Sequence, residues 1–170
     1  MKSKPFAISA IVAVDNNGGI AADGVMPWPR DSQDLARFRS ITQNQIVIMG
    51  RKTWDAPDMP SPLPNRINIV VSRHGAIAGE KQPDAIICPS QIGESLELIQ
   101  ESWPEKRCFC IGGSQVLELL KPNISTLYLT EFVEDYKCNI RLNMENMLNG
   151  MKCQNREILQ NKIWTTWIRD

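Results

Sequence analysis

Asp34 is the first residue in this sequence whose type and position could do chemistry. It stands in the first turn of a predicted helix, on the side that carries the apolar residues Leu35 and Phe38. A carboxylate is costly to bury there unless a cationic or amidine-like ligand pairs with it. An acid near a helix N-terminus also interacts favourably with the helix dipole. Spacing alone favours this structural role over a ligand site.

Basic residues at the ends of two predicted strands could bind one anion. Strand 46–49 leads into Gly50-Arg51-Lys52-Thr53, and strand 67–71 leads into Ser72-Arg73. Main-chain amides and cations converge where a strand meets a helix N-terminus, which suits a phosphate. Two neighbouring parallel strands that end in cations would bracket a ribose 2′-phosphate. Backbone at Ile111-Gly112-Gly113-Ser114 could approach a pyrophosphate, although a Gly-Gly pair alone is more typical of close helix–strand packing.

The segment 15–30 combines flexible and stiff residues in a way that suits a flap. Gly18-Gly19 and Gly24 supply hinge freedom, and Met26-Pro27-Trp28-Pro29 carries a large flat apolar surface. Such a loop could close over a planar ligand. The alternative is an ordinary surface loop with a core tryptophan.

Apolar runs of strand length alternate with segments of helical spacing, which predicts an α/β fold with a mostly parallel sheet. Helices are expected after the cap signals Asp31-Ser32 and Ser90, and after Gly112-Gly113. The tail 155–168 is expected to form an edge hairpin around residues 160–162. The other strands are expected at 6–14, 46–49, 67–71, 85–88, 108–111 and 126–132.

Composition limits the remaining classes of function. The chain has 170 residues, which predicts a single globular domain over 1–170. Nineteen basic residues balance nineteen acidic ones without any Lys/Arg block, so neither a nucleic-acid nor a membrane surface is expected. His74 is the only histidine and lies in a polar turn segment, which leaves little basis for a nucleophilic triad.

The cysteines and the N-terminal residues indicate in which cellular compartment the protein is expected. Five irregularly spaced cysteines predict reduced cytosolic thiols, and the pair Cys108 and Cys110 lacks the further ligands of a metal site. Lys2 and Lys4 before an apolar run resemble the start of a signal peptide. The run is rich in β-branched residues and meets Asp15-Asn16-Asn17 at once, which favours a mature N-terminal strand.

Several segments of the sequence, in the order in which they occur, resemble the dihydrofolate reductase family over nearly the whole chain. The segments that carry the resemblance are Ile11-Val12-Ala13-Val14, Met26-Pro27-Trp28, Asp34-Leu35-x-x-Phe38, Ile48-Met49-Gly50-Arg51-Lys52-Thr53-Trp54, Leu63-Pro64-x-Arg66, Ile69-Val70-Val71-Ser72-Arg73, Ile111-Gly112-Gly113 and Leu127-Tyr128-Leu129-Thr130. The resemblance implies an eight-stranded mixed, mostly parallel sheet with flanking helices and a C-terminal antiparallel hairpin. It also implies a cytoplasmic, monomeric enzyme that reduces 7,8-dihydrofolate to tetrahydrofolate with NADPH and without a metal.

The resemblance further implies the roles of individual residues. The expected catalytic residues are Asp34, Thr130, Trp28 and Met26. The expected substrate-binding residues are Ile11, Val12, Ala13, Asp34, Leu35, Phe38, Leu63, Arg66, Ile111 and Thr130. The expected cofactor-binding residues are Ala13, Ile20, Gly50, Arg51, Lys52, Thr53, Val71, Ser72, Arg73, Ile111, Gly112, Gly113, Ser114, Gln115 and Val116.

Within these groups, Asp34 would pair with the pterin 2-amino group and N3, in one hydrogen-bond network with Thr130. Leu63 would contact the aminobenzoyl ring, and Arg66 would pair with the folate α-carboxylate. Arg51, Lys52 and Arg73 would hold the 2′-phosphate of NADPH, and Gly112-Gly113 would carry a cis peptide. Hydride would pass from nicotinamide C4 to pterin C6, with water delivering the proton to N5.

Some positions depart from the family pattern. The flap has Ile20-Ala21 in place of Ile-Gly, and Leu117 replaces an aromatic residue. Cys138-Asn139 and Leu142-Asn143 replace Gly-Asp and Phe-Pro in the last long loop, so we expect a less favoured closed flap. Two alternatives stay open: a reductase of the same fold that acts on a riboflavin-pathway pyrimidine, and a non-catalytic pterin- or nucleotide-binding protein. Arg66 and Asp34 together argue against the first, because that substrate lacks a glutamate tail.

Overall fold

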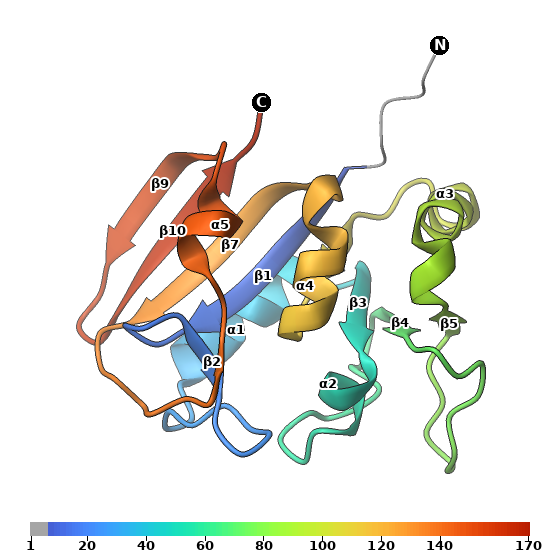
Figure 1. Cartoon of the computed structure of the whole chain (residues 1–170), viewed down its shortest axis with the longest axis horizontal. Helices are drawn as coiled ribbons and strands as arrows, with labels where there is room; N and C mark the ends of the chain where they lie inside the picture. The colour runs from blue at the N-terminus through green and yellow to red at the C-terminus, as the bar shows by residue number, and fades with distance from the viewer. Residues whose placement is uncertain (1–6) are drawn as a thin grey trace.

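The computed structural model describes residues 7–170, and its centre is an eight-stranded sheet in the order β5-β4-β3-β6-β1-β7-β10-β9 (Figure 1). The strands of this sheet are β1 (Ile8–Val14), β3 (Ile46–Gly50), β4 (Ile67–Val71), β5 (Ala85–Ile87), β6 (Cys108–Cys110), β7 (Ile124–Phe132), β9 (Lys152–Ile158) and β10 (Lys162–Ile168). All neighbours from β5 to β7 pair in parallel, and β10 is antiparallel to both β7 and β9. The predicted mixed sheet with a C-terminal hairpin is confirmed.

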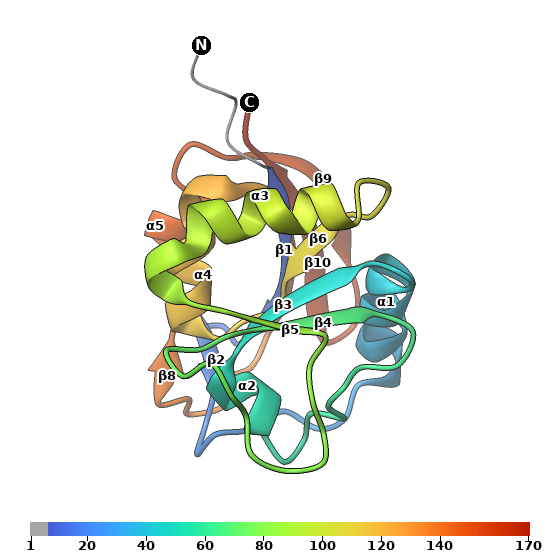
Figure 2. The same cartoon turned by 90° about the vertical axis from the view of Figure 1, so that its right-hand side faces the viewer.

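Helices cover both faces of this sheet, with α1 and α4 on opposite sides (Figure 2). The helices are α1 (Ser32–Thr42), α2 (Arg51–Asp55), α3 (Ile92–Ser102), α4 (Ser114–Leu120) and α5 (Met144–Leu148), with 3-10 turns η1 (Pro89–Gln91) and η2 (Lys121–Asn123). Residues of β3 alternate between two core clusters: Ile46 and Ile48 pack with α3 and α4, while Val47 and Met49 pack with Trp54 on the other face. A strand covered on both faces needs apolar residues at every position, which explains the continuous apolar runs.

The helix caps agree with the sequence in one case and differ in the other. Asp31 caps α1 as predicted, because its Oδ1 accepts a hydrogen bond of 2.9 Å from the Asp34 main-chain N–H. Ser90, the expected cap of α3, lies instead inside η1, and Gln91 occupies the cap position without a side-chain bond. Pro89 presets a helical φ one position before Ser90, so the chain turns earlier than expected.

Strand ends also shift, most of them by one or two residues. Phe6, the first residue of the first expected strand, lies outside the described residues. The larger change is in the C-terminal hairpin, where β9 begins at Lys152 and β10 begins at Lys162. Lys162 is therefore not part of the turn, as the sequence suggested, but a strand residue that is only 2% exposed.

The five cysteines all lie in the described part of the chain, and all are free thiols. Cys108 and Cys110 are buried on β6, and burial raises the pKa of Cys110 to about 12. Within residues 7–170, no group of three or more His, Cys, Asp and Glu side chains could hold a metal ion. Over the same range, no helix combines the length and apolarity that crossing a membrane would require.

A second, smaller sheet joins the expected flap to the last long loop. β2 (Gly19–Ala21) pairs antiparallel with β8 (Ile140–Arg141), so segments more than a hundred residues apart lie side by side. This pairing places the flap against the loop that precedes α5.

Candidate active site

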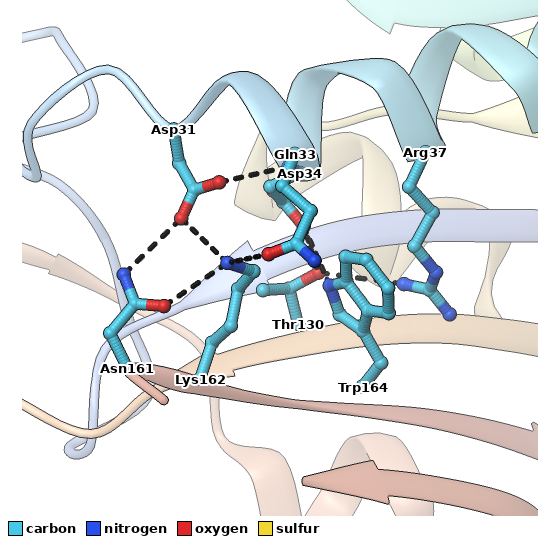
Figure 3. Close-up of polar contacts among 8 residues, drawn as sticks. All are labelled: Asp31, Gln33, Asp34, Arg37, Thr130, Asn161, Lys162 and Trp164. Atoms are coloured by element: carbon cyan, nitrogen blue, oxygen red, sulfur yellow. Dashed lines mark hydrogen bonds and ion pairs between the residues drawn. The ribbon is translucent and has the colours of Figure 1, made fainter. Parts of the chain in front are cut away.

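Asp34 lies where α1 crosses two strands of the sheet (Figure 3). Its Oδ1 accepts a hydrogen bond of 2.7 Å from the Thr130 hydroxyl on β7 and one of 2.9 Å from the Trp164 indole N–H on β10. Arg37, one turn along α1, lies over the Trp164 ring at 4.9 Å and donates to Thr130 Oγ1 at 3.5 Å. Donors on β7 and β10 thus hold the Asp34 carboxylate, and Arg37 of the same helix covers the Trp164 ring.

An ion pair between buried Lys162 and partly buried Asp31 attaches the start of α1 to β10. The Lys162 ammonium donates to Asp31 Oδ2 at 2.8 Å, to Gln33 Oε1 at 2.9 Å and to Asn161 Oδ1 at 3.1 Å (Figure 3). Burial by itself would raise the pKa of Asp31, but hydrogen bonds from Lys162, the Asp34 main chain and Asn161 outweigh it and lower that pKa. The helix turn that carries Asp34 is therefore fixed to the sheet at two points.

The strand face beneath α1 supplies an apolar floor beside Asp34. Ala13 on β1 stands opposite Thr130 in the β1–β7 register, and Ile11 stands opposite Tyr128. Val12 belongs instead to the core on the α4 side, so any ligand contact of Val12 on the Asp34 side has to come from its main chain. The sequence predicted Ile11, Val12 and Ala13 together as substrate-binding residues, but side chains alternate along β1, so Val12 faces away from Ile11 and Ala13.

Farther along α1, a group of apolar side chains lies next to the Arg66 guanidinium. Phe38 and Ile111 pack against a cluster that includes Leu63. The Arg66 guanidinium lies 5.7 Å from the Phe38 ring centroid and donates through Nε to Thr42 Oγ1 at 3.0 Å. Arg66 also borders a hollow of about 240 Å³, whose other lining residues, Asn44, Asn65, Ile67 and Lys106, lie outside the predicted site. Thr42 is eight residues beyond Asp34, or roughly 12 Å along the helix, so acid and cation mark two ends of one surface.

Three glycines lie where the carboxyl ends of β3 and β6 meet. The Gly50 N–H donates to Gly112 O at 2.9 Å, and the Gly112–Gly113 peptide is cis. A Cβ at Gly50 would stand only 3.0 Å from Val116 Cγ2, and Gly112 has φ +117°, which side-chain-bearing residues rarely adopt. Gly112 therefore favours glycine through its backbone conformation and Gly50 through close packing, and both bring main chain close to the start of α4.

The expected 2′-phosphate cations lie at the ends of adjacent strands, as predicted. Gly50 pairs with Val71 in the β3–β4 register, so the residues after each strand are neighbours. Lys52 and Arg73 are exposed there. Arg51 is already engaged in an ion pair of 2.8 Å with Asp55.

The flap is anchored at its beginning by a buried acid. Asp15 Oδ1 accepts from the main-chain N–H groups of Asn17 and Gly19 at 2.9 and 2.8 Å, and Oδ2 accepts from Tyr136 N–H at 3.0 Å. Burial opposes ionisation of Asp15, but these three donors outweigh it and lower its pKa. One carboxylate thereby joins the flap to the last long loop.

The middle of the flap is also bonded to that loop. The Asn139 N–H donates to Ala21 O at 3.0 Å, and Asn139 Oδ1 accepts from Asp23 N–H at 3.3 Å. Trp28 stacks on Phe132 with ring centroids 4.8 Å apart. Met26, by contrast, is 44% exposed, and its main-chain N–H donates to Asp58. Flap-to-loop hydrogen bonding is therefore present despite the replaced residues.

Comparison with known proteins identifies the family. The family model for dihydrofolate reductase matches residues 7–159. Dihydrofolate reductase type 8 of Escherichia coli is 30% identical over 151 residues, which cover 85% of this chain and 88% of that protein. The chain belongs to the dihydrofolate reductase family.

Further comparisons show that the chain shares the fold of a solved structure and matches only part of some longer proteins. A solved structure of dihydrofolate reductase from Enterococcus faecalis, complexed with NADP(H) and RAB-propyl, has a TM-score of 0.76 at 22% identity and covers 96% of both chains. The bifunctional dihydrofolate reductase-thymidylate synthase of Paramecium tetraurelia is 35% identical over 137 residues, 79% of this chain. This chain spans only 28% of that bifunctional protein and 26% of the one from Daucus carota.

The family match includes every site residue that the sequence predicted, but it ends before β10. Trp164 and Lys162 lie beyond it, and neither is among the site residues that the sequence predicts. No local pattern singles out Trp164, because its contact with Asp34 depends on how β10 pairs with β7. Leu117, which replaces an aromatic residue, is fully buried in the core on the α4 side.

Proposed function

We propose that this protein reduces 7,8-dihydrofolate to tetrahydrofolate with NADPH, within a single domain over residues 1–170. Membership of the dihydrofolate reductase family supports the reaction class. The observation that carries the proposal is the Asp34 carboxylate, held by Thr130 and Trp164 above an apolar floor, with Arg66 at the other end of the same surface.

That surface suits an elongated ligand with a flat polar ring at one end and a carboxylate at the other. Asp34 would accept hydrogen bonds from the pterin 2-amino group and N3, and Phe38 and Ile11 would pack on the ring. Leu63 would contact the aminobenzoyl group. Arg66 uses Nε and Nη1 within the protein, and a guanidinium has five N–H donors, which leaves others for the α-carboxylate of folate.

The glycine-lined strand ends fit a dinucleotide. A Cβ at Gly50 would crowd Val116, and Gly112 has a φ of +117°, so the main chain at these two positions carries no side chain and allows close approach of a pyrophosphate. The exposed cations Lys52 and Arg73 would hold a 2′-phosphate and so select NADPH over NADH. The related Enterococcus faecalis enzyme was solved with NADP(H).

In the proposed reaction, bound NADPH supplies a hydride from nicotinamide C4 to pterin C6. Asp34 would fix the pterin through its pyrimidine edge and provide negative charge as the ring becomes protonated. The carboxylate pairs with the edge opposite N5, so a water molecule would deliver the N5 proton. Trp28 and Met26, from the flap, would limit access of bulk water to the ring.

We further propose that the protein works as a monomer in the cytoplasm, where its free thiols would stay reduced. Size-exclusion chromatography tests the monomer.

Loss of NADPH absorbance on addition of dihydrofolate tests the proposed reaction. Turnover with dihydrofolate but not with a riboflavin-pathway pyrimidine supports it. Turnover only with the pyrimidine points to the other reductase, and ligand binding without NADPH oxidation points to a non-catalytic protein. Asp34→Asn serves as the control that separates reduction at this site from a contaminating activity.

A further inference from the structure

We infer that Trp164 is a positioning residue for Asp34, whose indole N–H holds the carboxylate in the orientation that receives the substrate. The inference rests on the proposed function, because it assigns a role in dihydrofolate binding. Trp164 does not have to touch the substrate for this role. It acts through one hydrogen bond of 2.9 Å from Nε1 to Asp34 Oδ1.

The two donors on Oδ1 determine which oxygen faces a ligand. Each carboxylate oxygen offers about two acceptor directions, and on Oδ1 these are taken by Thr130 and Trp164. Within residues 7–170, no protein group donates to Asp34 Oδ2. Oδ2 is therefore the oxygen with its full accepting capacity available to an incoming N–H donor.

The direction of the Thr130 bond is also determined by the surroundings. Arg37 has only N–H groups to offer, so the Thr130 oxygen accepts from Arg37 and its hydroxyl proton points to Asp34. Trp164 likewise can only donate. Asp34 thus receives two neutral donors and no direct cation, and its negative charge is not cancelled by an ion pair within the described part of the protein.

The indole ring itself has little freedom to turn. Trp164 stands directly opposite Thr130 in the β7–β10 register, so the sheet sets the spacing of the two donors. Arg37 covers one side of the ring at 4.9 Å, and the Lys162 ammonium lies 5.7 Å from its centroid. Lys162 also binds Asp31 at the start of α1. Strand β10 therefore holds both the helix that carries Asp34 and the indole ring that donates to Asp34.

Trp164→Phe tests the inference, since it removes the N–H and keeps an aromatic ring. Trp167→Phe is the matched control: Trp167 is on the same strand and also donates an indole hydrogen bond, but to Thr165 Oγ1 at 2.8 Å, and it packs on the α4 side. We expect kcat/KM for dihydrofolate to fall at least about tenfold in Trp164→Phe, as for loss of a hydrogen bond to a charged group. Trp167→Phe should stay within about twofold of wild type, as should NADPH affinity in both variants.

Combining each change with Asp34→Asn separates positioning from packing. If Trp164 acts through Asp34, Trp164→Phe loses most of its effect in the Asp34→Asn background, both in kcat/KM and in dihydrofolate affinity measured by calorimetry. An equal loss in both backgrounds, a loss matched by Trp167→Phe, or an equal loss of NADPH affinity would overturn the inference. Wild-type protein that neither binds nor reduces dihydrofolate would overturn the proposed function itself, whereas an active wild type with an unaffected Trp164→Phe variant would overturn only the role of Trp164.

Discussion

Replacing Lys162 by methionine removes a buried ammonium that joins β10 to the start of α1. Lys162 is 2% exposed and its partner Asp31 is 12% exposed, so the change leaves a carboxylate with restricted access to water. Removing one partner of a buried ion pair costs about 3–5 kcal/mol. Asp31 keeps its bonds to the Asp34 main chain and to Asn161, which places the expected loss near 3 kcal/mol.

Thermal and urea unfolding measure this loss. For a chain of this size, about 3 kcal/mol corresponds to a fall in Tm of roughly 6–12 °C. Lys152→Met is the matched control, because Lys152 forms an ion pair with Asp170 on the exposed hairpin, where both side chains are 77% exposed. It should cost below about 0.5 kcal/mol. A loss under about 1 kcal/mol for Lys162→Met, or equal losses in the two variants, would refute the reasoning.

The same ion pair predicts how this difference depends on pH. The pKa of Asp31 is lower in the folded protein than its ordinary value of 3.8, so the unfolded chain binds a proton first as pH falls. The stabilisation is complete well above pH 3.8 and is lost as pH falls through the folded-state pKa. The gap in stability between wild type and Lys162→Met should therefore narrow below about pH 3.8 and stay constant between pH 6 and 8.

Three further predictions concern the active site and the flap. Asp34→Asn should lower the rate of hydride transfer by roughly 10²–10³ while NADPH affinity is retained, with partial recovery at low pH where the substrate is protonated; near-wild-type activity at neutral pH would remove Asp34 from the mechanism. Arg73→Ala should weaken NADPH far more than NADH in equilibrium titrations, because a phosphate contact contributes about 1.5–3 kcal/mol, and equal losses would show that Arg73 binds no phosphate. Asn139→Asp should slow amide exchange in residues 16–26 of the free protein, since a carboxylate strengthens the bond that Asn139 Oδ1 accepts from Asp23 N–H. Unchanged exchange would point to Ala21 as the residue that limits closure.

The sequence by itself was enough to predict the fold class and several local features. Alternating apolar runs and helical spacing predict the layered sheet, because a strand covered on both faces requires apolar residues throughout. The cap at Asp31 and the glycines at the ends of β3 and β6 are equally local, since each depends on a few residues of backbone geometry. The family resemblance added the pairing of Asp34 with Thr130, which the structure shows as a hydrogen bond of 2.7 Å.

Only the tertiary structure decided which further groups surround Asp34. Trp164 is 130 positions from Asp34 in the chain. The local sequence predicts Lys162 in a turn, and only the pairing of β10 with β7 makes it a strand residue. A shift of one residue in that register would turn Trp164 to the other face of the sheet. The register depends on the packing of the whole hairpin against β7 and α1, and on a buried lysine finding all its acceptors there. These are non-local conditions, and no short stretch of sequence contains them.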